Sequence, residues 1–432
     1  MLIDKIKKII NILPSYPHYK MNIFSGTNNK HEFKKVFKFL LLGKDIVTGE
    51  DINKYEKSIK NLLQNDDIYT FASGRMGFYT ILKSIGIKED DEVIIPSYTC
   101  IVVPNAIIYR GAKPVYCDIK NNDFNIDVSK IENLITDKTK VLYAQHTFGQ
   151  MCDITAIKNI AKKHNLIIVE DAALALGAKA EEGYAGTIGD FGYFSTDRSK
   201  VINTGLGGFV SVNNEIFKEK FQKEYEGVPF LDKKYTKKIA ITFLLNLIFS
   251  HPRVYWIGKF MSVILTKLNI MRYFLDEKML TKPTNYSYPA KLSNILAKVG
   301  LTQMQNLDKN IQHRKKVAKY YNDILNIYTD DYINNSKNIF LRYSFLVNNR
   351  DKWEKKFSKV IELSSWFKSV TEGRDSNFEE IFYKIGSNTV SENATKHVLN
   401  LPTHNKINPK KLKQYLIALK NSEDIITNKG VL

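Results

Sequence analysis

Between about residues 68 and 213, short apolar runs rich in β-branched and aromatic residues alternate with amphipathic stretches. Residues 76–85 and 154–164 carry apolar side chains at helical spacing, whereas the short runs are typical of buried strands. Strands that alternate with helices predict a mostly parallel sheet, covered on both faces and linked by right-handed crossovers. The predicted strands are residues 68–72, 92–96, 113–119, 141–146, 166–170, 191–195 and 208–213.

A different pattern follows residue 290. Apolar residues recur at helical spacing from Leu301 through Leu307 to Val317, which predicts one long helix, and residues 340–347 are typical of a strand. A chain of 432 residues is long enough to form more than one lobe. The expected fold class is α/β, with a mostly parallel central sheet in a large domain and a smaller C-terminal α+β domain. The expected parts are an N-terminal arm (residues 1–40), the large domain (41–232), a helical insert (233–282) and the C-terminal domain (283–432).

The insert contains a strongly basic stretch. Residues 233–275 include no Asp or Glu, while Lys and Arg recur throughout. Two apolar runs in this stretch, residues 239–249 and 254–265, are both shorter than the ~20 residues that cross a bilayer. Apolar helices flanked by basic residues are typical of a membrane surface, and they also suit a protein or dimer contact. Both alternatives remain open at this point.

Composition excludes several classes of protein. Hydrophobic residues make up 44% and charged residues 25%, as in an ordinary globular protein. The net charge of +19 has two explanations, attraction to anions and a general abundance of lysine. We find no zinc-finger spacing, RNP-like motif or basic reading helix, so no nucleic-acid partner is expected.

The cysteines and the N-terminus indicate a location. Three cysteines without a CxxC pair favour a reducing compartment and predict no metal site. Residues 1–13 are amphipathic but lack the apolar core and cleavage site of a signal peptide. A cytoplasmic location is therefore expected, at the inner face of the membrane if the insert contacts lipid.

Two polar residues follow neighbouring predicted strands. Asp171 comes directly after the strand at 166–170, and Lys200 lies in the loop after 191–195, before a glycine-rich turn. In parallel sheets, ligands gather outside the carboxyl ends of the strands. A lysine can form a Schiff base with the aldehyde of pyridoxal phosphate, and a carboxylate can keep its pyridine nitrogen protonated. The pattern therefore predicts a pyridoxal phosphate site.

Several motifs occur in order around these residues. They are Ala-Ser-Gly-Arg-Met at 72–76, Asp-Glu-Val-Ile-Ile-Pro-Ser-Tyr-Thr at 91–99, Gly-Ala-Lys-Pro-Val at 111–115, His-Thr-Phe-Gly-Gln at 146–150, Glu-Asp-Ala-Ala at 170–173, and 195–208. In these motifs the chain resembles the DegT/DnrJ/StrS sugar aminotransferase family, pyridoxal phosphate enzymes of the aspartate-aminotransferase fold (fold type I). The resemblance is collinear over about residues 40–215 and resumes at about 285–321.

The resemblance implies roles for individual residues. Lys200 would hold the cofactor and move a proton between the substrate carbon and the cofactor, and Asp171 would pair with the pyridine nitrogen. Ser195 would bind the cofactor phosphate together with the turn at 73–76, where a helix begins, since helix N-termini favour anions. Asn285 would reach the phosphate from a neighbouring subunit, which implies a homodimer with shared active sites.

Three positions depart from the family pattern. Cys100 stands where an aromatic residue usually stacks on the pyridine ring, Leu174 replaces a usual Gln, and Ser287 stands where an Arg is expected. His146 has two interpretations, a contact to cofactor or substrate and a structural histidine at a strand end. The candidate catalytic residue is Lys200, and the candidate cofactor-binding residues are Gly74, Arg75, Met76, Cys100, His146, Asp171, Ser195, Lys200 and Asn285.

The expected function is transfer of an amino group, with glutamate as donor, to a keto-sugar that is nucleotide-activated or lipid-linked. Such a step would serve cell-surface glycan biosynthesis or a related pathway. Dehydratases of the family carry His in place of the lysine, so Lys200 favours transamination. The alternatives are another pyridoxal phosphate reaction, such as decarboxylation or dehydration, and a non-catalytic membrane-associated binding protein of the same fold.

Overall fold

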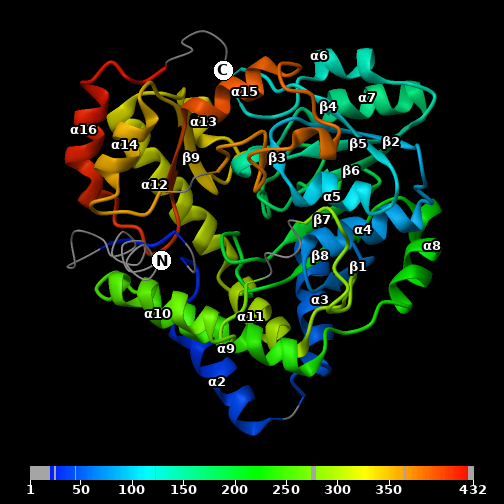
Figure 1. The fold of residues 1–432 in the computed structure, drawn as a ribbon, viewed down its shortest axis with the longest axis horizontal. Coiled ribbons are helices and arrows are strands. Elements are labelled where there is room, and N and C mark those ends of the chain that lie inside the picture. The colour runs from blue at the N-terminus through cyan, green and yellow to red at the C-terminus, as the bar shows by residue number, and fades with distance from the viewer. Residues whose placement is uncertain are drawn as a thin grey trace.

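The computed structural model describes residues 20–23, 26–43, 45–121, 123–273, 279–363 and 366–426, so residues 1–19 of the expected arm lie outside it. A seven-stranded sheet in the order β1-β8-β7-β6-β5-β2-β4 organises the larger part of the molecule (Figure 1). Its strands are β1 (Ile68–Phe71), β2 (Glu92–Pro96), β4 (Lys113–Cys117), β5 (Thr139–Gln145), β6 (Ile167–Asp171), β7 (Phe191–Ser195) and β8 (Gly208–Val212).

The sheet is mostly parallel, as the sequence pattern predicts. Strands β4, β2, β5, β6 and β7 run parallel, while β8 pairs antiparallel with both β7 and β1. Because β7 and β8 are antiparallel neighbours, the loop between them starts and ends at the same end of the strands. This loop contains Lys200, and it lies at the carboxyl ends of the parallel strands β5 and β6. The topology therefore brings Lys200 and Asp171 to one end of the sheet.

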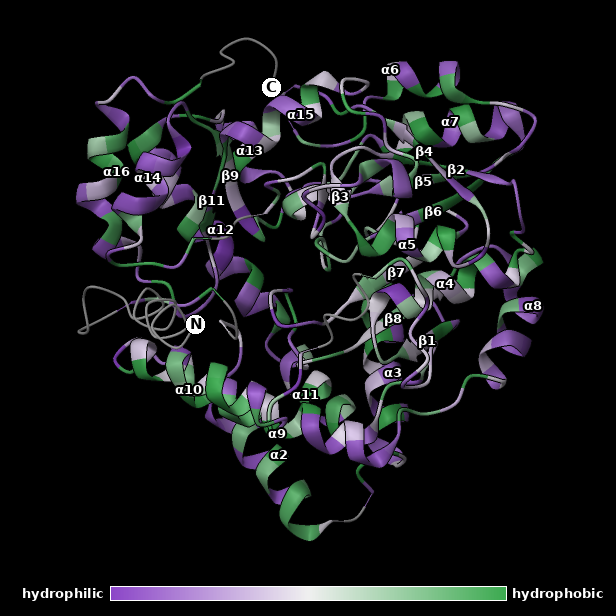
Figure 2. Cartoon of the chain, in the orientation of Figure 1, coloured by the Kyte–Doolittle hydropathy of each residue, from purple (hydrophilic) through white to green (hydrophobic). Residues whose placement is uncertain are grey.

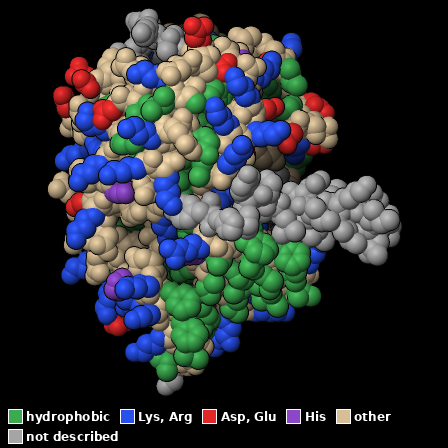
Figure 3. Space-filling view, turned by 90° about the vertical axis from the view of Figure 1, so that its left-hand side faces the viewer, with side chains coloured by type: hydrophobic (Ala, Val, Ile, Leu, Met, Phe, Trp, Pro, Cys, Tyr) green, Lys and Arg blue, Asp and Glu red, His purple; other side chains and the backbone are tan. Residues whose placement is uncertain are grey.

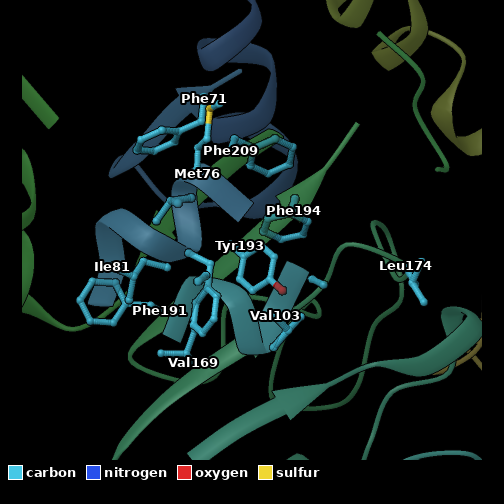
Figure 4. Close-up of a cluster of buried hydrophobic side chains, with 14 of the residues drawn as sticks. Phe71, Met76, Ile81, Val103, Val169, Leu174, Phe191, Tyr193, Phe194 and Phe209 are labelled. Atoms are coloured by element: carbon cyan, nitrogen blue, oxygen red, sulfur yellow. The ribbon is translucent and has the colours of Figure 1, made fainter. Parts of the chain in front are cut away.

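Helices cover the sheet and build its core. Figure 4 shows Met76 and Ile81 of α4 close to aromatic side chains of the strands, among them Phe71, Phe191 and Phe209. The helices of this part are α3 (Glu50–Leu63), α4 (Gly74–Ser84), α5 (Val102–Ile108), α6 (Val128–Ile131), α7 (Ile154–His164), α8 (Glu215–Glu226) and α11 (Asn294–Met304).

A second, smaller core lies in the C-terminal part. The antiparallel strands β9 (Arg342–Leu346) and β11 (Val398–Pro402) pack with helices around the buried Trp353, Phe357 and Leu416. These helices are α12 (Leu307–Leu325), α13 (Asp330–Asn334), α14 (Arg350–Phe357) and α16 (Lys413–Lys420). Ala394 of α15 (Thr389–His397) belongs instead to a third small cluster with Tyr98 and Phe148.

The prediction of a single long helix after residue 290 is wrong. The chain forms α11 and α12 instead, because Asn306 leaves helical geometry with φ −121° and ψ 13°. Buried residues as far as Ile311 belong to the larger core, and the smaller core begins at Val317 on the same helix. The domain boundaries expected from the sequence remain a prediction.

A short parallel pairing joins the two parts. Strand β3 (Thr99–Cys100) follows β2, and it pairs with β10 (Thr371–Glu372) from the C-terminal part. The pairing places the chain around residues 366–372 against the large sheet.

The two predicted apolar helices of the insert form α9 (Lys233–Phe249) and α10 (Tyr255–Lys267). Asp232 caps α9 by accepting hydrogen bonds from the backbone amides of Lys234 and Tyr235. Of the 13 residues of α10, Tyr255 and Gly258 are buried, although most of the helix is apolar. Figure 2 shows these apolar residues on α9, α10 and the neighbouring α2 (Lys30–Leu42). Within the described ranges, no helix is long and apolar enough to span a membrane.

Candidate active site

A cavity of about 370 Å³ lies beyond the carboxyl ends of the central strands. Its walls come from the loop after β7, the start of α4, β3, and the C-terminal segment beside β10. Six of the candidate residues line it: Gly74, Arg75, Cys100, Asp171, Ser195 and Lys200. The structure thus brings together residues that are up to 126 positions apart in the sequence, between Gly74 and Lys200.

Lys200 is buried in the cavity wall, and this burial favours its neutral form. Desolvation lowers the pKa of Lys200, although the nearby Asp171 and Cys100 oppose this shift. The ammonium nitrogen lies 4.7 Å from the centroid of the Trp366 ring, which covers it from the C-terminal part. A lowered pKa increases the fraction of neutral amine at physiological pH, and the neutral amine is the nucleophilic form.

Asp171 ends a chain of phenols. Its Oδ2 accepts a hydrogen bond of 2.6 Å from the hydroxyl of Tyr143, and its Oδ1 accepts one of 2.9 Å from the Ala173 amide. Since the Tyr143 proton points to Asp171, Tyr193 is the donor in the short contact between the two tyrosines. Burial raises the pKa of both tyrosines well above the ordinary value, so both remain donors. The chain fixes the orientation of the carboxylate toward the cavity.

The neighbouring Glu170 points to the opposite side of the strand and is structural. Its carboxylate accepts hydrogen bonds from the amides of Gly186, Ile188 and Gly189 at 2.6–2.9 Å. It also contacts His146 Nε2 at 2.9 Å. The alternation of side chains along β6 therefore separates a structural acid from the acid that faces the cavity.

His146 does not line the cavity. The ring is fully buried, and its Nδ1 accepts a hydrogen bond of 3.2 Å from the Cys152 amide while Nε2 meets Glu170. Burial lowers the pKa of His146, and the contacts with Cys152 and Glu170 oppose this effect. Since Nδ1 accepts a hydrogen bond, the proton of the ring lies on Nε2, toward Glu170. These contacts match the structural interpretation of this residue. The adjacent Gln145 lines the cavity instead.

The start of α4 has the features of an anion site. The helix begins after Ser73, whose buried Oγ has no hydrogen-bond partner in the described part of the chain, and Ser73 lines the cavity together with Ser195. A Cβ on Gly74 would lie 2.8 Å from the Phe194 carbonyl oxygen, so only glycine permits this close approach of α4 to β7. Exposed amides at a helix start and an unused hydroxyl suit a phosphate. The residues present therefore fit the phosphate of the expected cofactor.

Met76 and Asn285 lie away from this cavity. Met76 is fully buried in the core, and only its place in the first turn of α4 connects it with the anion site. Asn285 is exposed, and its carbonyl oxygen accepts a hydrogen bond of 2.8 Å from the Tyr235 hydroxyl. Its expected contact from a neighbouring subunit remains a prediction. No group of side chains suited to a metal ion occurs in the ranges that the structure describes.

The two unusual residues Cys100 and Leu174 both line the cavity. Burial raises the pKa of Cys100, which keeps it a neutral thiol, and its Sγ donates to the Glu372 carbonyl oxygen at 3.7 Å. Gln145 accepts a hydrogen bond of 2.6 Å from the Thr99 hydroxyl and so holds the strand that carries Cys100. The cavity wall at these positions is small and apolar.

Sequence reasoning missed part of the wall. Trp366, Phe367 and Glu372 reach the cavity through the pairing of β10 with β3, for which no local pattern gives a signal. Tyr193 was detectable, since it stands two residues before Ser195 on one strand and must share its face.

The chain is similar to known aminotransferases over most of its length. The model of the DegT/DnrJ/EryC1/StrS aminotransferase family matches residues 27–420. A GDP-perosamine synthase from Escherichia coli O157:H7 is 30% identical over 68% of this chain and 68% of its own length. A GDP-perosamine synthase from Caulobacter vibrioides is 29% identical over 63% of this chain, and the match spans 61% of that relative.

Solved structures show the same fold. A putative sugar aminotransferase from Streptococcus pneumoniae, in its PMP form, superposes with a TM-score of 0.72 at 19% identity, covering 94% of this chain and 98% of that one. This likeness confirms the fold class predicted from the sequence.

Proposed function

The chain belongs to the DegT/DnrJ/EryC1/StrS aminotransferase family, as its motifs predicted, and we propose that it transfers an amino group to a keto-sugar with pyridoxal phosphate as cofactor. The observation that carries the proposal is the cavity in which Lys200, Asp171 and the start of α4 meet. The names of the two GDP-perosamine synthases support a sugar as the acceptor.

The cavity offers a separate group for each part of the cofactor. Ser73, Gly74 and Ser195 would hold the phosphate at the start of α4, and Asp171 would pair with the pyridine nitrogen. When bound, pyridoxal phosphate supplies an aldehyde that condenses with amines and a ring that accepts the electron pair of the reacting carbon. Trp366 and Phe367 cover the same cavity from the C-terminal part and exclude water.

Lys200 then acts as the base and acid of the reaction. Its neutral amine would remove the proton from the substrate carbon and would deliver a proton at the carbon next to it. The lowered pKa of Lys200 suits the base, because burial increases the fraction of its amine that is neutral. Asp171, whose carboxylate is oriented by the hydroxyl of Tyr143, would pair with the ring nitrogen.

We take glutamate as the amino donor. The test is the half-reaction in the absence of sugar: purified enzyme loaded with pyridoxal phosphate should convert one glutamate per site to 2-oxoglutarate, with a change in cofactor absorbance. Decarboxylation or dehydration on the same scaffold would leave no 2-oxoglutarate. A non-catalytic binding protein would show no cofactor absorbance even after addition of pyridoxal phosphate.

We further propose a homodimer with shared active sites, supported by the exposed position of Asn285. Mixing inactive Asn285→Leu protein with inactive Lys200→Ala protein should restore up to about a quarter of wild-type activity, because hybrid dimers contain one intact site. Sedimentation of a monomer, or full activity of Asn285→Leu alone, would contradict the shared site.

A second proposal concerns the outer surface of α2, α9 and α10, which we propose rests on the inner face of an anionic membrane. Figure 3 shows hydrophobic side chains gathered on this face, with Lys and Arg around them. The exposed apolar residues, which we call the apolar patch, are Phe37, Leu41, Leu42, Ile248, Ile257, Leu268 and Ile270.

Apolar side chains among cations suit a membrane surface that carries anionic lipid. Flotation with phosphatidylglycerol vesicles tests this: Leu268→Asp should reduce the floated fraction, whereas Ile216→Asp on α8, at an equally exposed site elsewhere, should not. Equal flotation of both variants, or none of the wild type, would reject the contact.

A further inference from the structure

The catalytic cavity is the first of three adjoining spaces. A small neck of about 30 Å³ and a groove of about 400 Å³ follow it. Arg75, Asp197 and Arg198 line both the cavity and the neck. Arg198 and Tyr273 line both the neck and the groove. The three spaces thus lie next to one another, from Lys200 to α9 and α10, and are separated by shared side chains.

The neck is rich in guanidinium groups. Arg75, Arg198 and Arg272 line it together with one carboxylate, that of Asp197. The Arg198 guanidinium lies 4.3 Å from the centroid of the Tyr273 ring. The Tyr273 hydroxyl in turn donates to Asn246 at 2.9 Å, which fixes the ring. A planar guanidinium group can donate two hydrogen bonds to the oxygens of one phosphate. Arg75 and Arg198 also line the larger cavity, so phosphate groups can meet them where the cavity joins the neck.

The groove between α9 and α10 has a different character. Phe249, Gly258 and Val263 line it, with Lys259 and Lys267 beside them. The hydroxyls of Ser262 and Thr266 donate to carbonyl oxygens of their own helix at 2.7 Å, which leaves the carbon atoms of this helix face to meet a ligand.

The charge around the groove has one sign over a long stretch. Residues 233–275 contain no acid, and the carboxylate that pairs with Lys259, at 2.6 Å, comes from Glu362 outside this stretch. Apolar walls among cations complement a ligand that is apolar along its length and anionic at one end.

We propose that the acceptor sugar is carried on a lipid diphosphate. The sugar would lie beside Lys200, the diphosphate would contact Arg75 and Arg198 where the cavity joins the neck, and the first part of the apolar chain would lie in the groove. This inference rests on the proposed aminotransferase function and names the carrier of its substrate. It also accounts for the apolar side chains that α9 and α10 turn to the groove, since these would contact the chain of the carrier. A nucleoside would instead place hydroxyls and a polar base edge against the carbon-rich face of α10.

The test measures binding to the cofactor-loaded enzyme by calorimetry, with farnesyl diphosphate as the probe and inorganic pyrophosphate and GDP as comparisons. Farnesyl diphosphate should bind at least tenfold more tightly than pyrophosphate. Val263→Asp should weaken farnesyl diphosphate binding about tenfold and leave pyrophosphate binding unchanged. The matched control is Ile216→Asp, which places the same charge at an exposed apolar site on α8, outside the groove and the apolar patch, and should bind like the wild type.

Several results would contradict the proposal of a lipid diphosphate carrier. They are equal affinities for farnesyl diphosphate and pyrophosphate, equal losses in Val263→Asp and Ile216→Asp, and tighter binding of GDP than of farnesyl diphosphate. The glutamate half-reaction is measured on the same preparations. If that half-reaction occurs while farnesyl diphosphate fails to bind selectively, the carrier is wrong and the aminotransferase stands. If farnesyl diphosphate binds selectively but no 2-oxoglutarate forms, the proposed reaction is wrong.

Discussion

The catalytic cavity and the α9–α10 surface both place cations beside apolar side chains, but they differ in how those side chains are packed. In the cavity, Tyr193 and Leu174 are buried, and the hydroxyl of Tyr193 is hydrogen-bonded. On α10, apolar residues such as Ile257 remain exposed. The first arrangement holds a few groups at fixed positions, which chemistry needs. The second leaves a helix face open, which suits a broad apolar ligand.

If the cavity owes its chemistry to fixed charges, removing the Asp171 charge should have the largest effect. Asp171→Asn keeps the shape but loses the negative charge toward the cavity. We expect the glutamate half-reaction to slow about 10³-fold, within the range seen for removal of a catalytic charge. Stopped-flow absorbance measures the rate. A loss below tenfold would show that the carboxylate does not act on the cofactor.

The structural acid next to it should affect stability instead. Glu170→Gln removes the charge that pairs with buried His146 and replaces an oxygen that accepts amide hydrogen bonds. The free energy of unfolding should fall by about 3 kcal/mol, as when one partner of a buried pair is lost. Urea unfolding measures this. If Glu170→Gln loses activity at unchanged stability, Glu170 acts in the reaction, and the assignment of a structural role to Glu170 and a catalytic role to Asp171 is wrong.

The phenol chain gives a smaller effect on the same cavity. Tyr143→Phe removes the 2.6 Å hydrogen bond to Asp171 while keeping the ring that packs against Phe78. The half-reaction should slow about tenfold, the equivalent of one charge-assisted hydrogen bond of about 1.4 kcal/mol. In the Asp171→Asn background, the additional loss should shrink, since the bond no longer meets a charge. If Tyr143→Phe slows the half-reaction equally in the wild type and in Asp171→Asn, Tyr143 does not act through Asp171.

The smallest expected effect is a shift along the pH axis. Since desolvation lowers the pKa of Lys200 from 10.5, binding of pyridoxal phosphate to the apoenzyme should gain speed with rising pH and level off below pH 10.5. Asp171 raises the pKa of Lys200, so Asp171→Asn should move this transition to lower pH. The rate of pyridoxal phosphate binding, measured as a function of pH for the wild type and for Asp171→Asn, tests both expectations. A transition at or above 10.5 would contradict the desolvated lysine.

The sequence predicted those features that depend on local pattern. Strands β2 and β7 have the predicted limits, and Lys200 and Asp171 meet because both follow strands of one sheet. His146 shows the limit of this reasoning: a shift of one residue along a strand reverses the face, and Gln145 lines the cavity in its place. Trp366 was beyond reach, because the β3–β10 pairing that brings it in joins distant segments.

The central claim is that Lys200 carries the cofactor. Reduction of the cofactor-loaded enzyme with borohydride, followed by digestion and mass spectrometry, tests it directly. The account predicts one phosphopyridoxyl group per chain, on the peptide that contains Lys200, and none in Lys200→Ala. A label on another lysine, or equal labelling of the Lys200→Ala protein, would contradict the account.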